Sequence, residues 1–155
     1  AAIEAHAASI IERGVSMLTL GGDHFITLPL LRAHAARHGP LSLVHFDAHS
    51  DTWRDTEGRI DHGTMFFHAA QQGVVDPSRS VQVGLRTTND ETHGFNILDA
   101  AWVHRNGPVR FTARMRDQVA KSVSRMGRKS AIPALLTSAS IRPNRSATAS
   151  TAIFT

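Results

Sequence analysis

Residues 42–51 constrain the fold more than any other part of the sequence. They form an apolar run that ends in Asp47, His49 and Asp51, at alternate positions. A short apolar run is typical of a buried strand in a parallel sheet. Ligands of open α/β sheets bind beyond the carboxyl ends of the strands, so these side chains are placed for a metal site. The alternative is a strand followed by a helix, in which Asp47 or Asp51 is only an N-cap and His49 is incidental.

Apolar patterns with the periods of helices and strands alternate over residues 1–105. The pattern predicts helices over residues 1–13, about 28–38 and 65–72, and strands over residues 15–20, 41–46, 80–85 and 95–98. Alternation of this kind predicts a mostly parallel α/β sheet whose loops gather at one edge.

Charge divides the 155-residue chain near residue 105. Residues 1–105 hold eight Arg, twelve Asp or Glu and all ten His, whereas residues 106–155 hold nine Lys or Arg and one acid, Asp117. The net charge of +4 therefore comes from the last third and does not mark the whole chain as a nucleic-acid binder. We predict a partial α/β domain with the metal-site motifs at 1–105 and a basic tail rich in Ser, Thr and Ala at 106–155.

The basic tail has little apolar periodicity. One amphipathic basic helix is predicted from the spacing of Met115, Val119, Val123 and Met126. From residue 130 on, the apolar density is too low to offset the entropy of ordering, so we expect irregular or disordered chain. A nucleic-acid-binding tail is the functional alternative, but no aromatic residue alternates with its charges to stack on bases.

Composition also bears on the compartment. The sequence has no cysteine, which excludes disulfides and thiolate metal sites and fits a reducing compartment. It shows no apolar run of membrane-spanning length and no signal-peptide pattern. We expect a cytoplasmic protein without a membrane partner.

Two successive strand ends carry residue types that bind metals. Gly21-Gly22-Asp23-His24 follows the first predicted strand, as residues 47–51 follow the second. Alternate residues of an extended segment lie about 6.5–7 Å apart, too far to share one ion easily. The spacing suits two ions about 3.5–4 Å apart that share a carboxylate. Carboxylates and imidazoles without sulfur favour Mn²⁺, with Zn²⁺, Fe²⁺ or Ni²⁺ as alternatives.

A metal centre of this kind can activate water for attack on an electron-poor planar carbon. A departing amine then needs a proton. His62, beside Gly63, is the candidate because histidine can gain and lose a proton near neutral pH. The alternative is a histidine that caps or packs beside the following helix.

Three motifs occur in order at suitable spacing, Gly-Gly-Asp-His at 21–24, Asp-Ala-His-Ser-Asp at 47–51 and His-Gly-Thr-Met-Phe at 62–66. Together they resemble the signature of the ureohydrolases, the arginase/agmatinase family. Residues 81–87 and 94–99 are more similar to bacterial agmatinases than to arginases. The resemblance covers about residues 1–105 and does not extend to the C-terminal third.

The resemblance implies a three-layer α/β/α fold of the arginase type with a mainly parallel sheet. It also implies a binuclear Mn²⁺ centre and a homo-oligomer. The reaction would be hydrolysis of a guanidino group to urea and an amine, which for agmatine is putrescine.

The motif match implies a role for each matching residue. His24, Asp47 and Asp51 would hold one ion, and Asp47 would bridge to a second ion held with His49. His62 would shuttle protons or position the substrate. Asp23, beside the ligand His24, would help to hold the ligands in place without itself binding an ion.

The sequence departs from the family after Asp99. The family supplies further metal ligands from a later Asp-x-Asp pair followed by Asp-Pro, and a downstream Glu that grips the guanidinium group. The only acid after Asp99 here is Asp117, and residues 133–140 read Pro-Ala-Leu-Leu-Thr-Ser-Ala-Ser where that strand is expected. We expect weakened metal binding and activity and an incomplete sheet. The hypothesis is a truncated, frameshifted chain, which sequencing of the surrounding DNA would test.

The sequence thus favours an agmatinase-like guanidino-group hydrolase. Another guanidino compound, such as guanidinobutyrate, is an alternative substrate, because the loops at 51–61 and 86–91 do not settle specificity and leave the substrate-binding residues unknown. A non-catalytic remnant is the alternative from a different functional class.

Overall fold

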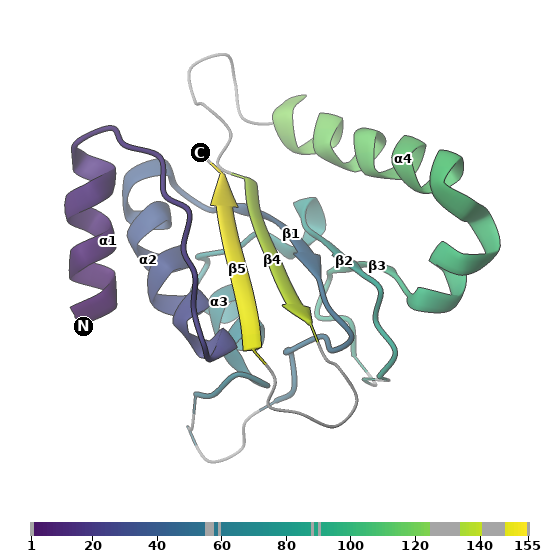
Figure 1. Cartoon of the computed structure of the whole chain (residues 1–155), viewed down its shortest axis with the longest axis horizontal. Coiled ribbons are helices and arrows are strands. Elements are labelled where there is room, and N and C mark those ends of the chain that lie inside the picture. The colour runs from purple at the N-terminus through teal and green to yellow at the C-terminus, as the bar shows by residue number, and fades with distance from the viewer. Residues whose placement is uncertain are drawn as a thin grey trace.

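The computed structural model describes residues 2–54, 58, 60–87, 89, 91–124, 134–140 and 148–154, with side chains up to residue 121. A central sheet carries helices on both faces (Figure 1). The helices are α1 (Ala2–Glu12), α2 (Thr27–His38), α3 (Met65–Gln71) and α4 (Ala100–Ser124), with 3-10 turns η1 (His24–Ile26) and η2 (Pro77–Arg79). The strands are β1 (Ser42–Phe46), β2 (Val81–Val83), β3 (Asn96–Leu98), β4 (Ala134–Ser140) and β5 (Thr148–Phe154).

The strands lie in the order β3-β2-β1-β4-β5 (Figure 1). Neighbours from β3 to β4 run parallel, and β5 runs antiparallel to β4. Strand β1 is central, with Val44 opposite Val81 on one side and opposite Leu136 on the other. The carboxyl ends of β1 and β2 therefore meet at one edge of the sheet, as the sequence predicts.

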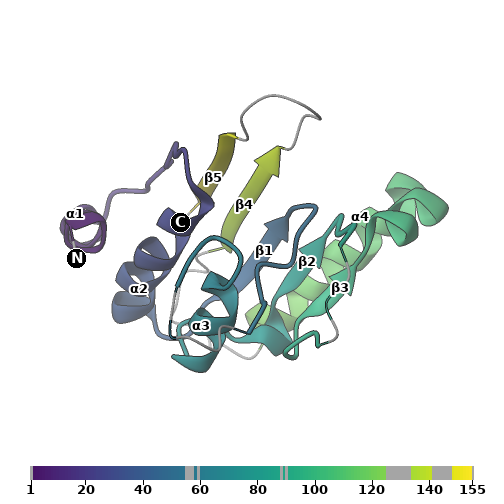
Figure 2. The ribbon, with the colours of Figure 1, turned by 90° about the horizontal axis from the view of Figure 1, so that it is seen from below.

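Helices α1, α2 and α3 lie on one side of the sheet and α4 on the other (Figure 2). Each side has its own apolar cluster of buried side chains. Leu43 of β1 belongs to the cluster built with α1, α2 and α3, which includes Leu28 and Phe66. Val44, the next residue, belongs to the cluster that packs against Trp102 of α4. Successive side chains of a strand point to opposite faces, so burial of both confirms a strand covered on both sides. The α/β/α architecture is confirmed in the described residues.

The positions of α1, α2 and α3 confirm the three predicted helices. Positive φ angles at Gly14 and Gly39 mark where α1 and α2 give way to turns, a conformation that glycine adopts without steric cost. Helix α4 crosses the predicted boundary at residue 105. It bends at Gly107, whose φ is 67°, just before Pro108, which cannot donate a helical hydrogen bond.

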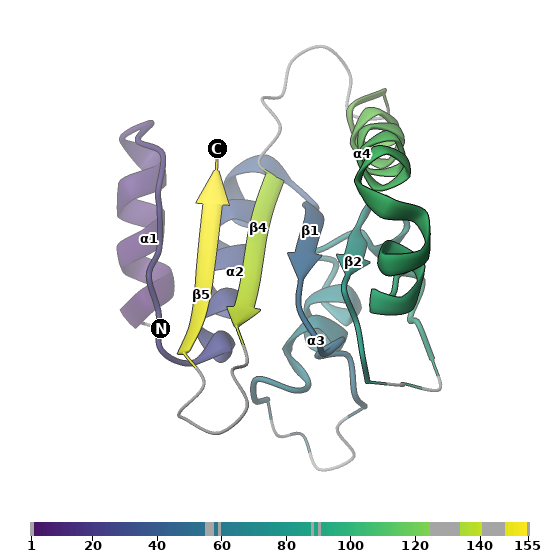
Figure 3. The same ribbon diagram turned by 45° about the vertical axis from the view of Figure 1, so that its right-hand side comes forward.

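The prediction of a strand at residues 15–20 is wrong. This segment follows α1 without strand pairing and runs beside β5 (Figures 1 and 3). Leu18 and Leu20 are 65% and 80% exposed. The position beside β1 is taken by β4, so the backbone of 15–20 has no free strand edge of β1 to join.

The C-terminal region also differs from the expectation of irregular chain, because residues 134–140 and 148–154 are strands. Ladder pairing uses backbone N–H and C=O groups, so it needs no apolar alternation in the added strand. The other residues beyond 124 lie outside the described set, and they include the rest of the segment from residue 130 on for which disorder is expected. No helix in the described part of the chain is both long and apolar enough to cross a membrane.

Candidate metal centre

The candidate ligands lie on two segments that meet at the carboxyl edge of the sheet. Asp47 follows the last residue of β1, and its backbone N–H donates to the carbonyl of Val83 in β2, at 3.1 Å. One Asp47 oxygen, Oδ1, accepts from the backbone N–H of His49 at 2.9 Å. His24 comes from the other segment, as the first residue of η1. Backbone pairing of β1 and β2 therefore positions the carboxylate at the centre of the cluster.

The side chains converge closely. His24 Nδ1 lies 2.8 Å from Asp51 Oδ2 and 3.5 Å from Asp47 Oδ2. His45 Nε2 lies 3.4 Å from the same Asp47 oxygen. Each of these four residues offers a ligand atom within 4.8 Å of the others. The geometry matches what a small cation needs, a set of nitrogen and oxygen donors facing one point.

Asp47 presents its two oxygens to different partners. Oδ2 faces His24 and His45, whereas Oδ1 lies 3.4 Å from Nδ1 of His49. The His49 side chain is 37% exposed, in contrast to 6% for His24. The cluster thus has a buried side and a solvent side, joined by one carboxylate.

The buried carboxylates of Asp47 and Asp51 need a nearby positive charge or hydrogen bonds to be stable. The side chains of Asp47 and Asp51 are 1% and 8% exposed. Among the described residues, no Arg or Lys forms an ion pair with either of them. Adjacent buried carboxylates are costly unless a cation or hydrogen bonds stabilise them. A divalent ion would supply that charge, so these residues fit a metal site.

Burial and contacts act in opposite directions on the ionisation of the cluster. Burial opposes ionisation of Asp47, but contacts with His45, the backbone N–H of His49 and nearby His24 outweigh it and hold the pKa of Asp47 below its usual value. Complete burial lowers the pKa of His45, despite the opposing attraction of Asp47 and Asp51. A carboxylate beside a neutral imidazole is the state that suits metal binding.

His62 and Asp23 lie together at the exposed rim. His62 Nδ1 is 3.8 Å from Asp23 Oδ2, and their side chains are 70% and 61% exposed. The other Asp23 oxygen accepts from the backbone N–H of Phe25 at 2.8 Å and caps η1. The contacts found for Asp23 are with this turn and with His62, so its proposed support of the ligands stays a prediction.

The loop that carries His62 is tied to the ligand segment. The backbone N–H of Trp53 donates to the carbonyl of Gly63 at 3.1 Å, and that of Phe66 donates to the carbonyl of Asp51 at 3.0 Å. These bonds hold His62 close to the residues that follow β1, although His62 itself makes no contact with a predicted ligand among the described interactions.

His45 is the member of the cluster that the motif analysis missed. The signal was present, because a period of two places His45 on the same face of β1 as Asp47. The prediction from the sequence included His45 only as a member of the apolar strand at residues 41–46. Its partner Gln82, fully buried in β2, could not be paired with it before the strand register was known.

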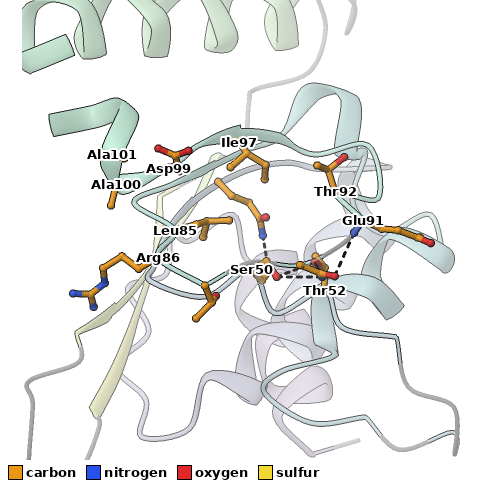
Figure 4. A pocket seen from close by; sticks show the side chains of 13 residues that line it. Ser50, Thr52, Leu85, Arg86, Glu91, Thr92, Ile97, Asp99, Ala100 and Ala101 are labelled. Carbon is orange, nitrogen blue, oxygen red and sulfur yellow. Dashed lines mark hydrogen bonds between the residues drawn. The ribbon is translucent and has the colours of Figure 1, made fainter. Parts of the chain in front are cut away.

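A cavity of about 540 Å³ adjoins this centre (Figure 4). Ser50 and Thr52 lie at its floor, where the Thr52 hydroxyl donates to the Ser50 hydroxyl at 3.0 Å. Arg86, Glu91 and Asp99 are also lining residues; the ends of the Arg86 and Glu91 side chains are directed away from Ser50 and Thr52 (Figure 4), and Glu91 pairs with Arg54 at 2.7 Å. The cavity is therefore next to the ligand segment, and its lining includes Arg86, Thr87, Asn89 and Glu91 from one of the loops that left substrate specificity open in the sequence.

Comparison with protein families matches residues 1–126 to the Arginase family. The chain belongs to this family. The match extends beyond residue 105 and covers the described part of α4. Membership in the arginase family confirms the ureohydrolase resemblance found in the motifs.

Individual relatives of this arginase-family chain carry agmatinase names. It is 56% identical over 104 residues to an agmatinase of Chromobacterium violaceum, covering 66% of this chain and 32% of that protein. It is 49% identical over 117 residues to an agmatinase of Proteus mirabilis, covering 76% and 38%. The chain thus spans about a third of the length of the curated relatives that it matches.

Solved structures agree on the fold. A hypothetical agmatinase from Burkholderia thailandensis superposes with a TM-score of 0.73 at 55% identity, over 76% of this chain and 38% of that one. The proclavaminate amidino hydrolase of Streptomyces clavuligerus gives a TM-score of 0.70 at 36% identity, over 76% and 41%. The arginase-like architecture is therefore present in the part of the fold that this chain contains.

Proposed function

We propose that this chain carries the first part of a binuclear manganese centre of an agmatinase-type guanidino-group hydrolase. The observation that supports this most is the position of Asp47. Its Oδ2 faces His24 and its Oδ1 faces His49, as a carboxylate that bridges two ions requires.

The ligand roles follow from the same contacts. His24, Asp47 and Asp51 would hold the ion on the buried side, and Asp47 with His49 would hold the ion on the solvent side. All of these donors are imidazole nitrogen or carboxylate oxygen, a set that suits Mn²⁺ among the divalent ions. The nearby cavity gives a guanidino compound room beside the centre.

The chemistry divides between the ions and the side chains. Bound divalent ions would supply Lewis-acid activation of water. Asp47 contacts the histidines on both sides of the centre and so fixes their relative positions. Water can reach the centre from the side of His49, because that side chain is partly exposed. His62 would hold a proton at the rim for the departing amine, with Asp23 3.8 Å away to orient the imidazole.

The proposed reaction is hydrolysis of agmatine to urea and putrescine. The agmatinase names of the relatives support this substrate. Guanidinobutyrate is the competing substrate, and Arg86 at the cavity wall gives that carboxylate a specific point of attraction that agmatine does not use. We further propose a homo-oligomer in the cytoplasm, without nucleic acid or membrane as a partner.

The chain alone is proposed to be a weak enzyme. The single acid after residue 99, Asp117, lies in α4 and pairs with Arg114 at 3.2 Å and Lys121 at 2.8 Å. It is therefore already neutralised by its own helix. The four proposed ligands, His24, Asp47, His49 and Asp51, leave two ions short of ligands and of negative charge.

The test is to load the purified chain with Mn²⁺ and measure bound metal and urea release. Agmatine, guanidinobutyrate and arginine are compared, with the Chromobacterium violaceum agmatinase as a positive control. We expect measurable Mn²⁺ binding that is lost in Asp47→Asn, and agmatine turnover far below that of the control enzyme. If the folded chain binds no Mn²⁺, a non-catalytic remnant describes it better.

A further inference from the structure

Gln82 lies behind the metal centre and is fully buried in β2. It stands opposite His45 in the ladder between β1 and β2. Its side-chain nitrogen Nε2 donates to the backbone carbonyl of Ser50 at 2.6 Å. The same nitrogen lies 3.1 Å from Nδ1 of His45.

The contact with Ser50 decides the orientation of the Gln82 amide. A backbone carbonyl can only accept a hydrogen bond, so the atom next to it must be the amide nitrogen. The opposite orientation would place two oxygens against each other at this distance. The second hydrogen of the Gln82 amide is then directed at Nδ1 of His45.

The orientation of Gln82 in turn selects one form of the His45 ring. Nδ1 must accept, so the proton of the neutral imidazole resides on Nε2. A doubly protonated ring would place its Nδ1–H donor against the amide donor of Gln82. Nε2–H then points into the cluster, 3.4 Å from Oδ2 of Asp47.

We propose that Gln82 is a positioning residue of the metal centre, which holds His45 as the Nε2–H tautomer so that His45 orients Asp47 instead of binding metal. This rests on the proposed metal-centre function. His45 has donor atoms close enough to belong to the ligand cluster, yet a protonated Nε2 has no lone pair for an ion. Gln82 thereby defines which of the two buried histidines coordinates.

Gln82 also braces the ligand loop itself. The carbonyl that it holds belongs to Ser50, between His49 and Asp51. Asp51 adopts a φ of 51°, which is uncommon for a residue other than glycine and needs support from its surroundings. One buried amide thus connects the orienting imidazole to the backbone that carries two candidate ligands.

The tautomer can be tested without metal or activity. Nitrogen-15 NMR of the metal-free wild-type chain distinguishes protonated from unprotonated imidazole nitrogens. We expect His45 to carry its proton on Nε2 and a lone pair on Nδ1. A proton on Nδ1 would overturn the proposal, whatever the result of the metal and urea assays.

The positioning role is tested with Gln82→Met, which keeps the shape and removes the donor. The matched control is Gln118→Met, because Gln118 is also buried, at 5% exposure, but lies in α4 on the opposite face. Circular dichroism first establishes that both variants fold. We expect Gln82→Met to mix the two His45 tautomers and to weaken Mn²⁺ binding about 10–100-fold, the usual effect of losing a group that orients a ligand. Gln118→Met should change neither the His45 tautomer nor the Mn²⁺ affinity.

The outcomes separate the two proposals. Wild-type affinity in a folded Gln82→Met variant would overturn the positioning role. A wild-type chain that binds no Mn²⁺ but shows the Nε2–H tautomer would refute the proposed function and leave the assignment of His45 intact. If Gln82→Met does not fold, the wild-type tautomer still decides the assignment.

Discussion

His24 Nδ1 and Asp51 Oδ2 lie 2.8 Å apart, at a point where the turn η1 meets the segment that follows β1. The two residues lie on different segments of the chain, so no local turn or helix brings them together. Their approach depends on packing of η1 and α2 against the sheet, where Leu28 and Leu43 share one apolar cluster. The metal-binding geometry is therefore a product of the core as well as of the motifs.

Asp51→Asn should reduce the stabilisation that Mn²⁺ confers. A ligand that binds only the folded state stabilises it by about 2.7 kcal/mol at a hundred times its Kd. Asn can also adopt the left-handed φ of Asp51, so the substitution removes the charge with little backbone strain. The measurement is the shift in Tm on adding Mn²⁺, with Asp117→Asn in α4 as the control. An equal shift in wild type and Asp51→Asn would contradict the ligand role.

His49→Ala should lower the number of Mn²⁺ ions bound from two to one. His49 stands alone on the solvent side of Asp47, while His24 and Asp51 serve the buried side. Electron paramagnetic resonance of titrated Mn²⁺ gives the stoichiometry and reports coupling between neighbouring ions. His104→Ala, on the exposed surface of α4, should keep the wild-type value. Two coupled ions in His49→Ala would show that His49 is not a ligand.

Gly84→Ala should destabilise the fold and disturb the metal centre together. Gly84 has a φ of +88°, and a Cβ there would lie 3.4 Å from the backbone oxygen of Asp47. A side chain at positive φ costs about 1–2 kcal/mol. The added pressure on Asp47 should also weaken Mn²⁺ binding severalfold.

Gly73→Ala is the matched control for this effect. Gly73 has a φ of +67° but no atom within 4 Å of the added Cβ. It should lose similar stability in urea unfolding while its Mn²⁺ affinity stays at the wild-type value. Equal affinities in Gly73→Ala and Gly84→Ala would remove the link between Gly84 and the centre.

His34 should make the fold sensitive to mild acid. Burial, with a contribution from His38, lowers the pKa of His34 from 6.5 to about 4. The unfolded chain takes up this proton below pH 6.5 and the folded chain only near pH 4, so stability falls as pH drops between these values. The loss from this group is about 2 kcal/mol at pH 5, since one pKa unit corresponds to about 1.4 kcal/mol.

His34→Leu should remove this part of the acid sensitivity. Both ring nitrogens of His34 are buried without a hydrogen-bond partner among the described residues, so the substitution should also raise stability at pH 7.5. Urea unfolding at pH 7.5 and pH 5 measures both effects. His6→Gln, on the exposed side of α1, should keep the wild-type pH dependence. If His34→Leu loses as much stability at pH 5 as wild type, the assigned role of His34 fails.

The sequence by itself determined the features that depend on local patterns. Apolar periodicity predicted α1, α2 and α3, because a helix buries one face whose spacing is visible in the chain. The apolar run at 42–46 predicted β1, and the Asp and His residues beyond it predicted the edge where the candidate ligands meet. The family resemblance came from the same short motifs.

Tertiary structure alone decided which extended segments pair and which side chains face each other. Residues 15–20 have the pattern of a strand, yet β4 occupies the edge of β1, because backbone pairing is open to any chain that reaches a free edge. The contact of Gln82 with His45 likewise follows from the register of β1 with β2. A one-residue shift of that register would turn Gln82 to the opposite face of the sheet, so no local pattern could have predicted it.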